Sequence, residues 1–149
     1  MKLLMQRLKV LPHTIVIVFH LFFGNIVFAE TGEMPKLSNV LAGELLYREF
    51  CLLCHKEKGI GEPKIPEGIR LPGYYTAMPL NETSHAWHHS DEQLFEIILK
   101  GLKRTERMPA FENILSHKDA YDLVAYIKSL WSPRIVSCQG KNHMRCMSH

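Results

Sequence analysis

The chain has 149 residues, 46% of them hydrophobic and 22% charged, with a formal net charge of +3 at pH 7. Residues 1–29 contain three of the 18 Lys and Arg residues and none of the 15 Asp and Glu residues, so residues 30–149 are neutral overall. The length suits one domain. Nothing in this charge balance suggests a nucleic-acid-binding surface, which would need a concentrated basic stripe with base-reading groups.

The N-terminus has the pattern of a secretory leader. Three basic residues precede an apolar stretch over residues 11–28, which ends in the small-residue pattern Val27-Phe28-Ala29. We therefore predict a signal peptide over residues 1–29, cleaved after Ala29, and export to the bacterial periplasm. An uncleaved membrane anchor is the alternative, but the stretch is interrupted and falls short of the ~20 residues that a spanning helix needs.

The first helix is predicted to run from about Ser38 into the cysteine pair at positions 51 and 54. Ser38 suits the N-cap position. An apolar face follows at helical spacing, formed by Leu41, Ala42, Leu45 and Leu46. Gly43 lies inside this helix, where glycine costs about 1 kcal/mol relative to alanine. We interpret Gly43 as a point of close contact with another helix.

The run Cys51-Leu52-Leu53-Cys54-His55 has the C-x-x-C-H spacing at which two thiols are joined to the vinyl groups of a haem. In that arrangement Cys51 and Cys54 become thioethers, and His55 binds the iron as its proximal ligand. A dithiol redox site would need a surrounding βαβ pattern, and a zinc site a second ligand pair at ordinary spacing. The sequence has neither, so we predict one covalently bound haem c and a second axial ligand further along the chain.

A stretch rich in proline and glycine follows His55 and predicts a long irregular loop. The second helix is expected to begin after Ser90, which opens a capping-box pattern, and to stop near Gly101. The third begins at Ser116 and ends before Pro133. Three short helices would be thinly packed without a large apolar group to bury, and a haem would supply that volume.

Three Met-Pro pairs, at Met34, Met78 and Met108, offer candidates for the second iron ligand. The proline biases each methionine toward an extended backbone, so each lies in a loop from which a flexible thioether can reach iron. Met34 precedes the first helix and so lies on the wrong side of the cysteine motif, because the second ligand is expected further along the chain. Met108 lies 53 residues beyond His55, enough chain to return on the opposite face of the haem. Met78 lies 23 residues beyond His55 and could also span the ring.

With these motifs in place, residues 38–131 resemble the class I c-type cytochromes. The resemblance implies an all-α, cytochrome c-like fold, with three main helices and long loops wrapped around one covalently bound haem. It favours Met108 as the distal iron ligand, with Met78 as the runner-up, because the family's methionine lies shortly before the C-terminal helix.

The resemblance also implies two supporting contacts. A small residue on the first helix crosses an aromatic residue on the last, which corresponds to Gly43 meeting Tyr126 or its neighbours. A proline carbonyl accepts the second ring proton of the proximal histidine, and Pro63 is the matching position for His55.

The segment over residues 83–89 departs from the simplest pattern, because it carries Trp87 and three histidines. His88 or His89 could act as an axial ligand. We prefer a turn before the second helix, with Trp87 against the haem edge and the histidines partly solvated.

The tail, residues 132–149, follows the predicted domain over residues 30–131. It is the second feature that departs from the simplest class I c-type cytochrome pattern. Its cysteines, Cys138 and Cys146, suit a disulfide in an oxidising compartment, provided that the chain turns between them. Its thiols, thioethers and imidazoles could instead hold Cu(I). We favour the disulfide over copper.

A haem with both axial positions filled does not readily bind oxygen or peroxide and is left with electron exchange. We therefore expect an electron-transfer protein rather than an enzyme, acting with redox protein partners or as part of a membrane-associated complex. A basic run before Met108 suggests a partner with an acidic docking surface, although the same cations would also favour a helix C-terminus. The run comprises Lys100, Lys103, Arg104 and Arg107. The alternatives are a haem sensor or enzyme subunit with a labile Met108, and a copper-handling protein that uses the tail.

Overall fold

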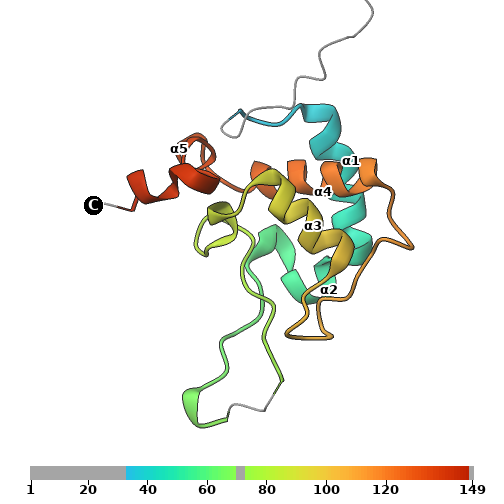
Figure 1. Ribbon diagram of the computed structural model, residues 1–149, viewed down its shortest axis with the longest axis vertical. Coiled ribbons are helices and arrows are strands. Elements are labelled where there is room, and N and C mark those ends of the chain that lie inside the picture. The colour runs from blue at the N-terminus through green and yellow to red at the C-terminus, as the bar shows by residue number, and fades with distance from the viewer. Residues whose placement is uncertain (1–32, 70–72, 148–149) are drawn as a thin grey trace, which may run out of the picture.

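The computed structural model describes residues 33–69 and 73–147, and the predicted leader over residues 1–29 lies outside them. This part of the chain is helical and contains no strand, so the predicted all-α class is confirmed (Figure 1). Its α-helices are α1 (Leu37–Phe50), α2 (Leu52–His55), α3 (Asp91–Lys100), α4 (His117–Ser129) and α5 (Pro133–Ser137). Its 3₁₀ helices are η2 (Glu57–Gly59), η3 (Glu67–Ile69), η4 (Ala86–His88) and η5 (Gly140–Arg145). None of the helices in these ranges has the length and apolar content needed to cross a membrane.

Helix α1 begins without the predicted cap. Its N-cap position is Lys36, and no side chain there accepts a hydrogen bond from the first turn. Ser38 is already inside the helix, and its hydroxyl donates to the Asn39 side chain over 3.1 Å. The prediction of Ser38 as N-cap is therefore wrong. A helix in a folded protein takes most of its stability from packing, which explains why the missing cap is tolerated.

Helices α1 and α4 pack closely at Gly43. A Cβ atom at Gly43 would lie 1.9 Å from the backbone oxygen of Asp122 and 2.9 Å from the Cβ of Tyr126. One turn further along α1, the ring of Tyr47 packs on that of Tyr126 with centroids 4.8 Å apart. The predicted close contact between Gly43 and the last main helix is confirmed. Because α2 follows α1 directly, this contact also fixes the cysteine motif relative to α4.

A capping box begins α3, as predicted, and another begins α4 at Ser116, where a helix start was predicted. The Ser90 hydroxyl accepts a hydrogen bond from the Gln93 amide (3.2 Å), and the Gln93 side chain accepts one from the Ser90 amide (2.9 Å). Ser116 and Asp119 make the equivalent pair of bonds, of 3.2 and 2.9 Å. Each box satisfies backbone donors that a helix N-terminus would otherwise leave unpaired.

Residues 60–69 and 73–85, between α2 and η4, belong to a long loop that extends away from the helices (Figure 1). The amide of Glu62 donates to the carbonyl of Ala77 (2.9 Å) where the two ends of this loop meet. Further along, the indole N–H of Trp131 donates to the carbonyl of Leu80 (2.7 Å). The predicted irregular loop is therefore present, and it is attached to the end of α4.

The tail is folded back on the domain. Pro133 occupies the first turn of α5, where its missing N–H is not needed. The side-chain amide of Gln139 donates to the Asp91 carboxylate (2.7 Å) and to the carbonyl of His89 (3.0 Å). These buried bonds attach the tail to the start of α3.

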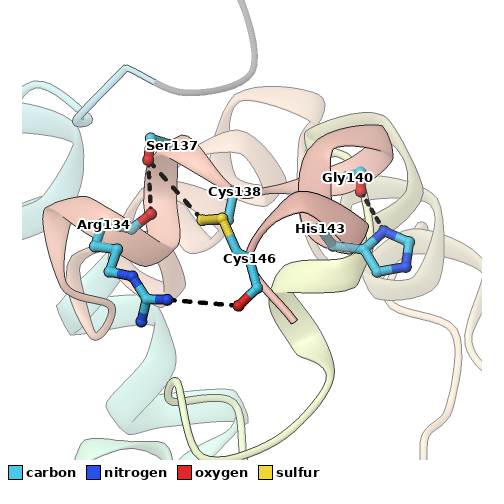
Figure 2. The surroundings of a disulfide bond; sticks show 6 residues. All are labelled: Arg134, Ser137, Cys138, Gly140, His143 and Cys146. Carbon is cyan, nitrogen blue, oxygen red and sulfur yellow. Dashed lines mark hydrogen bonds between the residues drawn. A yellow bond between two sulfur atoms is a disulfide. The ribbon is translucent and has the colours of Figure 1, made fainter. Parts of the chain in front are cut away.

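Cys138 and Cys146 are joined by a disulfide, with their Cα atoms 6.0 Å apart (Figure 2). The turn of η5 lies between them, and within it Nδ1 of His143 is 2.6 Å from the carbonyl oxygen of Gly140. Both sulfurs are used in the bond, so neither is a thiolate ligand for the copper alternative. No group of three or more His, Cys, Asp or Glu side chains in the described ranges is arranged to hold a metal ion.

Candidate haem site

A largely apolar cavity of about 730 Å³ lies among α2, α3, α4 and the loops that connect them. This volume falls within the range of roughly 300–1,000 Å³ that is usual for ligand and cofactor cavities. Its apolar wall includes Phe50, Leu94, Ile97, Ile98, Leu102, Phe111, Leu123 and Ile127. The short helices thus enclose a space rather than closing on one another.

Cys51 and Cys54 line one side of this cavity. They are three residues apart on a helical turn and therefore share a face, and both are free thiols. Burial, together with the neighbouring Cys54, raises the pKa of the Cys51 thiol to about 12. A thiol of this kind is protonated and unreactive as a dithiol redox centre, which needs a lowered pKa. Two thiols facing an apolar cavity instead suit thioether bonds to a bound haem.

His55 lines the same side of the cavity, and its ring is oriented by the backbone. Nδ1 lies 3.1 Å from the carbonyl oxygen of Met78. Because a carbonyl only accepts, Nδ1 carries the proton, and Nε2 keeps the lone pair that a metal ligand needs. Burial lowers the pKa of His55, against the smaller raising effect of the Met78 hydrogen bond. The imidazole is therefore held neutral, in its ligand form.

Met78, and not the predicted Pro63, supplies the carbonyl that accepts the His55 proton. Gly61, with φ of 72°, packs so closely on residues 77–79 that a Cβ there would lie 2.6 Å from the Ala77 oxygen. This close approach brings the Met78 carbonyl to His55, whereas the exposed Pro63 lies where the chain turns away into the long loop. Which carbonyl accepts the His55 proton therefore depends on how the long loop returns to pack against Gly61.

Met108 is half-buried and lines the cavity. It lies in the segment between α3 and α4, which is closed by a hydrogen bond from the Leu102 amide to the Met108 carbonyl (3.0 Å). Gly101, with φ of 68°, makes this turn possible, because a Cβ there would lie 2.7 Å from the Met108 oxygen. A flexible thioether is thereby placed on the cavity wall by a segment remote in sequence from the cysteine motif.

The other two methionine candidates differ from Met108. Met78 also lines the cavity, but it is 43% exposed and its carbonyl is engaged by His55. Met34 is 46% exposed and is not part of the cavity wall.

The polar rim of the cavity carries most of the predicted basic run. Lys103, Arg104 and Arg107 line it, whereas Lys100 forms an ion pair with Glu96 on the surface of α3. Arg104 lies over the ring of Tyr75, with its Cζ 5.4 Å from the ring centroid. The rim therefore presents positive charge where the cavity opens.

The segment over residues 83–89 does not place Trp87 on the cavity. His85 and His89 line the cavity, but Trp87 and His88 do not. The Trp87 ring packs on His88, with centroids 4.2 Å apart, and faces His143 of the tail at 6.5 Å. The expected contact between Trp87 and the haem edge is therefore wrong, because the folded tail offers this side chain another partner.

The residues present fit a haem. The cavity is apolar, two free thiols lie beside a histidine whose Nε2 is available, and a methionine thioether lies on the wall formed by another segment.

Comparison with protein families gives a match over residues 38–127 to the family described as cytochrome C oxidase, cbb3-type, subunit III. Neither a curated protein nor a solved structure matches the chain.

Proposed function

Since the chain belongs to the family of cbb3-type cytochrome c oxidase subunit III, we propose that it is an exported mono-haem c-type cytochrome that carries single electrons between redox partners. Cys51 and Cys54 would hold the haem covalently, and His55 and Met108 would be the ligands of its iron. When bound, the haem supplies a one-electron Fe(III)/Fe(II) couple.

The observation that carries this proposal is the composition of the cavity wall. It combines the two free thiols of the C-x-x-C-H motif and the neutral imidazole of His55 with apolar side chains and Met108. The apolar side chains exclude water from the metal position. A methionine ligand raises the reduction potential above that expected for two histidines.

The backbone supports Met108 over Met78 as the distal ligand. The carbonyl of Met78 is bound to Nδ1 of His55, so the Met78 backbone is held beside the proximal ligand. Met108 comes from a separate segment, and its carbonyl is bound by the Leu102 amide rather than by His55.

The ligand assignment is tested by absorption spectroscopy of protein produced with cytochrome c maturation. We expect Met108→Ala to abolish the methionine-to-iron(III) charge-transfer band in the red, while Met78→Ala keeps it. A band lost only in Met78→Ala would contradict the assignment of Met108.

The proposed partners are redox proteins with an acidic surface near the docked haem edge, in line with an oxidase subunit or its electron donor. Lys103 and Arg104 are exposed at the cavity rim and make no ion pair among the described residues. We expect the electron-transfer rate to fall as salt is raised, since exposed charges more than a Debye length apart are screened. A rate independent of salt would remove the docking proposal.

Export is proposed from the leader pattern and from the need to attach haem on the export side of the membrane. Determining the N-terminus of protein purified from the periplasm tests it. An N-terminus at Glu30 is expected, and retention of residues 1–29 would favour the anchor.

A further inference from the structure

An ion pair between Glu62 and Arg107 joins two segments that are 45 residues apart. Nη1 of Arg107 lies 2.7 Å from Oε2 of Glu62, and Nη2 lies 2.7 Å from Oε1, so the contact is bidentate. The Glu62 side chain is 17% exposed and that of Arg107 is 30% exposed. Paired hydrogen bonds between a guanidinium and a carboxylate combine charge with fixed geometry.

The Glu62 side of this ion pair is built into the segment that orients His55. Oε2 of Glu62 also accepts a hydrogen bond from the amide of Ala77 (2.8 Å), and the Glu62 amide donates to the Ala77 carbonyl (2.9 Å). The next residue is Met78, whose carbonyl accepts the Nδ1 proton of His55. Glu62 therefore holds the backbone next to the group that fixes the proximal imidazole.

The Arg107 side is adjacent to Met108. Besides the Glu62 carboxylate, the Arg107 guanidinium donates to the carbonyl of Tyr75 (2.8 Å) and lies 4.5 Å from the centroid of the Tyr74 ring. At the rim of the cavity, Arg107 thus contacts the loop beside His55 in three ways: through the Glu62 carboxylate, the Tyr75 carbonyl and the Tyr74 ring.

We propose that the Glu62–Arg107 ion pair positions Met108 against the iron. It does so by joining the segment that carries Arg107 and Met108 to the loop residues beside His55, which are Glu62 and residues 74–78. This inference rests on the proposed function, because it takes Met108 as the distal ligand. Opening the Met108 segment requires the bidentate contact and the bond to Tyr75 to break together.

The geometry separates this ion pair from ordinary surface pairs, which contribute little. The pair of Glu96 and Lys100 links neighbouring turns of one helix, and both side chains are at least 50% exposed. The Glu62–Arg107 ion pair is more buried, is bidentate and spans two segments. The hydrogen bond to the Arg107 guanidinium, together with that from the Ala77 amide, lowers the pKa of Glu62 to about 2, so the carboxylate stays charged at neutral pH.

Two readouts on the mature haem protein test the proposal. The first is the affinity of the reduced protein for carbon monoxide, which requires Met108 to leave the iron and so follows the population of the open state. The second is hydrogen exchange at the Leu102 amide, whose hydrogen bond to the Met108 carbonyl reports opening of the segment directly. An ion pair that only stabilised another part of the fold would not change the carbon monoxide affinity and the Leu102 exchange rate together.

We expect Glu62→Gln and Arg107→Gln each to raise carbon monoxide affinity and Leu102 exchange by about 10-fold, with weakening of the red charge-transfer band. Arg107→Lys keeps the charge but not the forked contact, so it should have a smaller effect in the same direction. If Arg107→Gln yields no folded protein, Arg107→Lys and Glu62→Gln carry the test. Lys100→Gln is the matched control, because it removes a nearby positive charge and the exposed Glu96–Lys100 ion pair but leaves the Glu62–Arg107 ion pair intact. Its values should stay within about twofold of the parent protein.

Unchanged affinity and exchange in both the Glu62 and the Arg107 variants would overturn the proposal, as would equal effects in Lys100→Gln. Met108→Ala separates this failure from failure of the proposed function. If the red band survives in Met108→Ala, the ligand assignment is wrong and the inference falls with it. If Met108→Ala abolishes the band while the ion-pair variants behave like the parent, only the positioning role is refuted.

Discussion

Replacing Gly43 with alanine tests whether the contact between α1 and α4 fixes the haem site. A Cβ at position 43 would lie 1.9 Å from the Asp122 backbone oxygen and 2.5 Å from the Asp122 carbonyl carbon. Both partners are backbone atoms of α4 and cannot rotate away. The helices would therefore have to separate.

The size of the effect follows from these distances. Carbon and oxygen atoms approach to roughly 3.3 Å at closest, so the helices must move apart by about 1.4 Å at this point. Alanine gains about 1 kcal/mol of helix propensity over glycine. Overpacking that shifts the backbone typically costs about 1–3 kcal/mol, and a displacement of this size belongs at the upper end of that range. The net loss should be about 2 kcal/mol, which lowers Tm by roughly 10 °C in a domain of this size.

Thermal unfolding of the mature protein, followed by circular dichroism, measures this loss. Gly68→Ala is the matched control, because a Cβ at Gly68 would meet nothing within 4 Å. It should change Tm little. A Gly43→Ala protein as stable as the parent would refute the argument that backbone contact requires glycine here.

Three further predictions concern stability. Replacing both cysteines of the disulfide with serine should cost about 2–3 kcal/mol in urea unfolding, given their sequence separation of 8, and an unchanged midpoint would contradict this. Hydrogen bonding to Arg107 lowers the pKa of Glu62 from 4.5 to about 2, so its stabilising contribution should be complete above pH 4.5 and disappear as pH falls toward 2. The Tm of Glu62→Gln should accordingly fall less steeply than that of the parent over this pH range, and parallel curves would refute the assignment. Ser116→Ala should cost about 1 kcal/mol in thermal unfolding by removing a cap, whereas Ser38→Ala should cost little, and equal effects would show that the cap is unimportant.

The features predicted correctly from the sequence are those with a signal in a few neighbouring residues. The spacing of Cys51, Cys54 and His55 identifies a haem motif, and all three line one cavity. The capping boxes that open at Ser90 and Ser116 locate two helix starts. In each case the interacting groups lie within one helical turn, so local spacing determines the contact.

The features that were missed depend on segments distant in the sequence. The acceptor for His55 is Met78 rather than Pro63, because the loop returns between them to pack on Gly61. The Glu62–Arg107 ion pair likewise depends on how the two loops meet at the cavity. No periodicity or spacing in one chain encodes such contacts.

The tail was also difficult to predict, for a related reason. The sequence indicated that its cysteines could pair, but not which surface the folded tail would cover. In the structure it packs beside Trp87, whose ring lies with its centroid 6.5 Å from that of His143. An aromatic residue next to a capped helix has several apolar partners available, and its neighbour is decided by tertiary packing.

We propose above all that haem is attached covalently through Cys51 and Cys54. Acid–acetone extraction of purified protein, produced with cytochrome c maturation and followed by mass spectrometry, tests it most directly. We predict that the pigment stays with the protein and that the protein mass includes one haem. Complete release of the pigment into the acetone, with the mass of the bare chain, would contradict the claim.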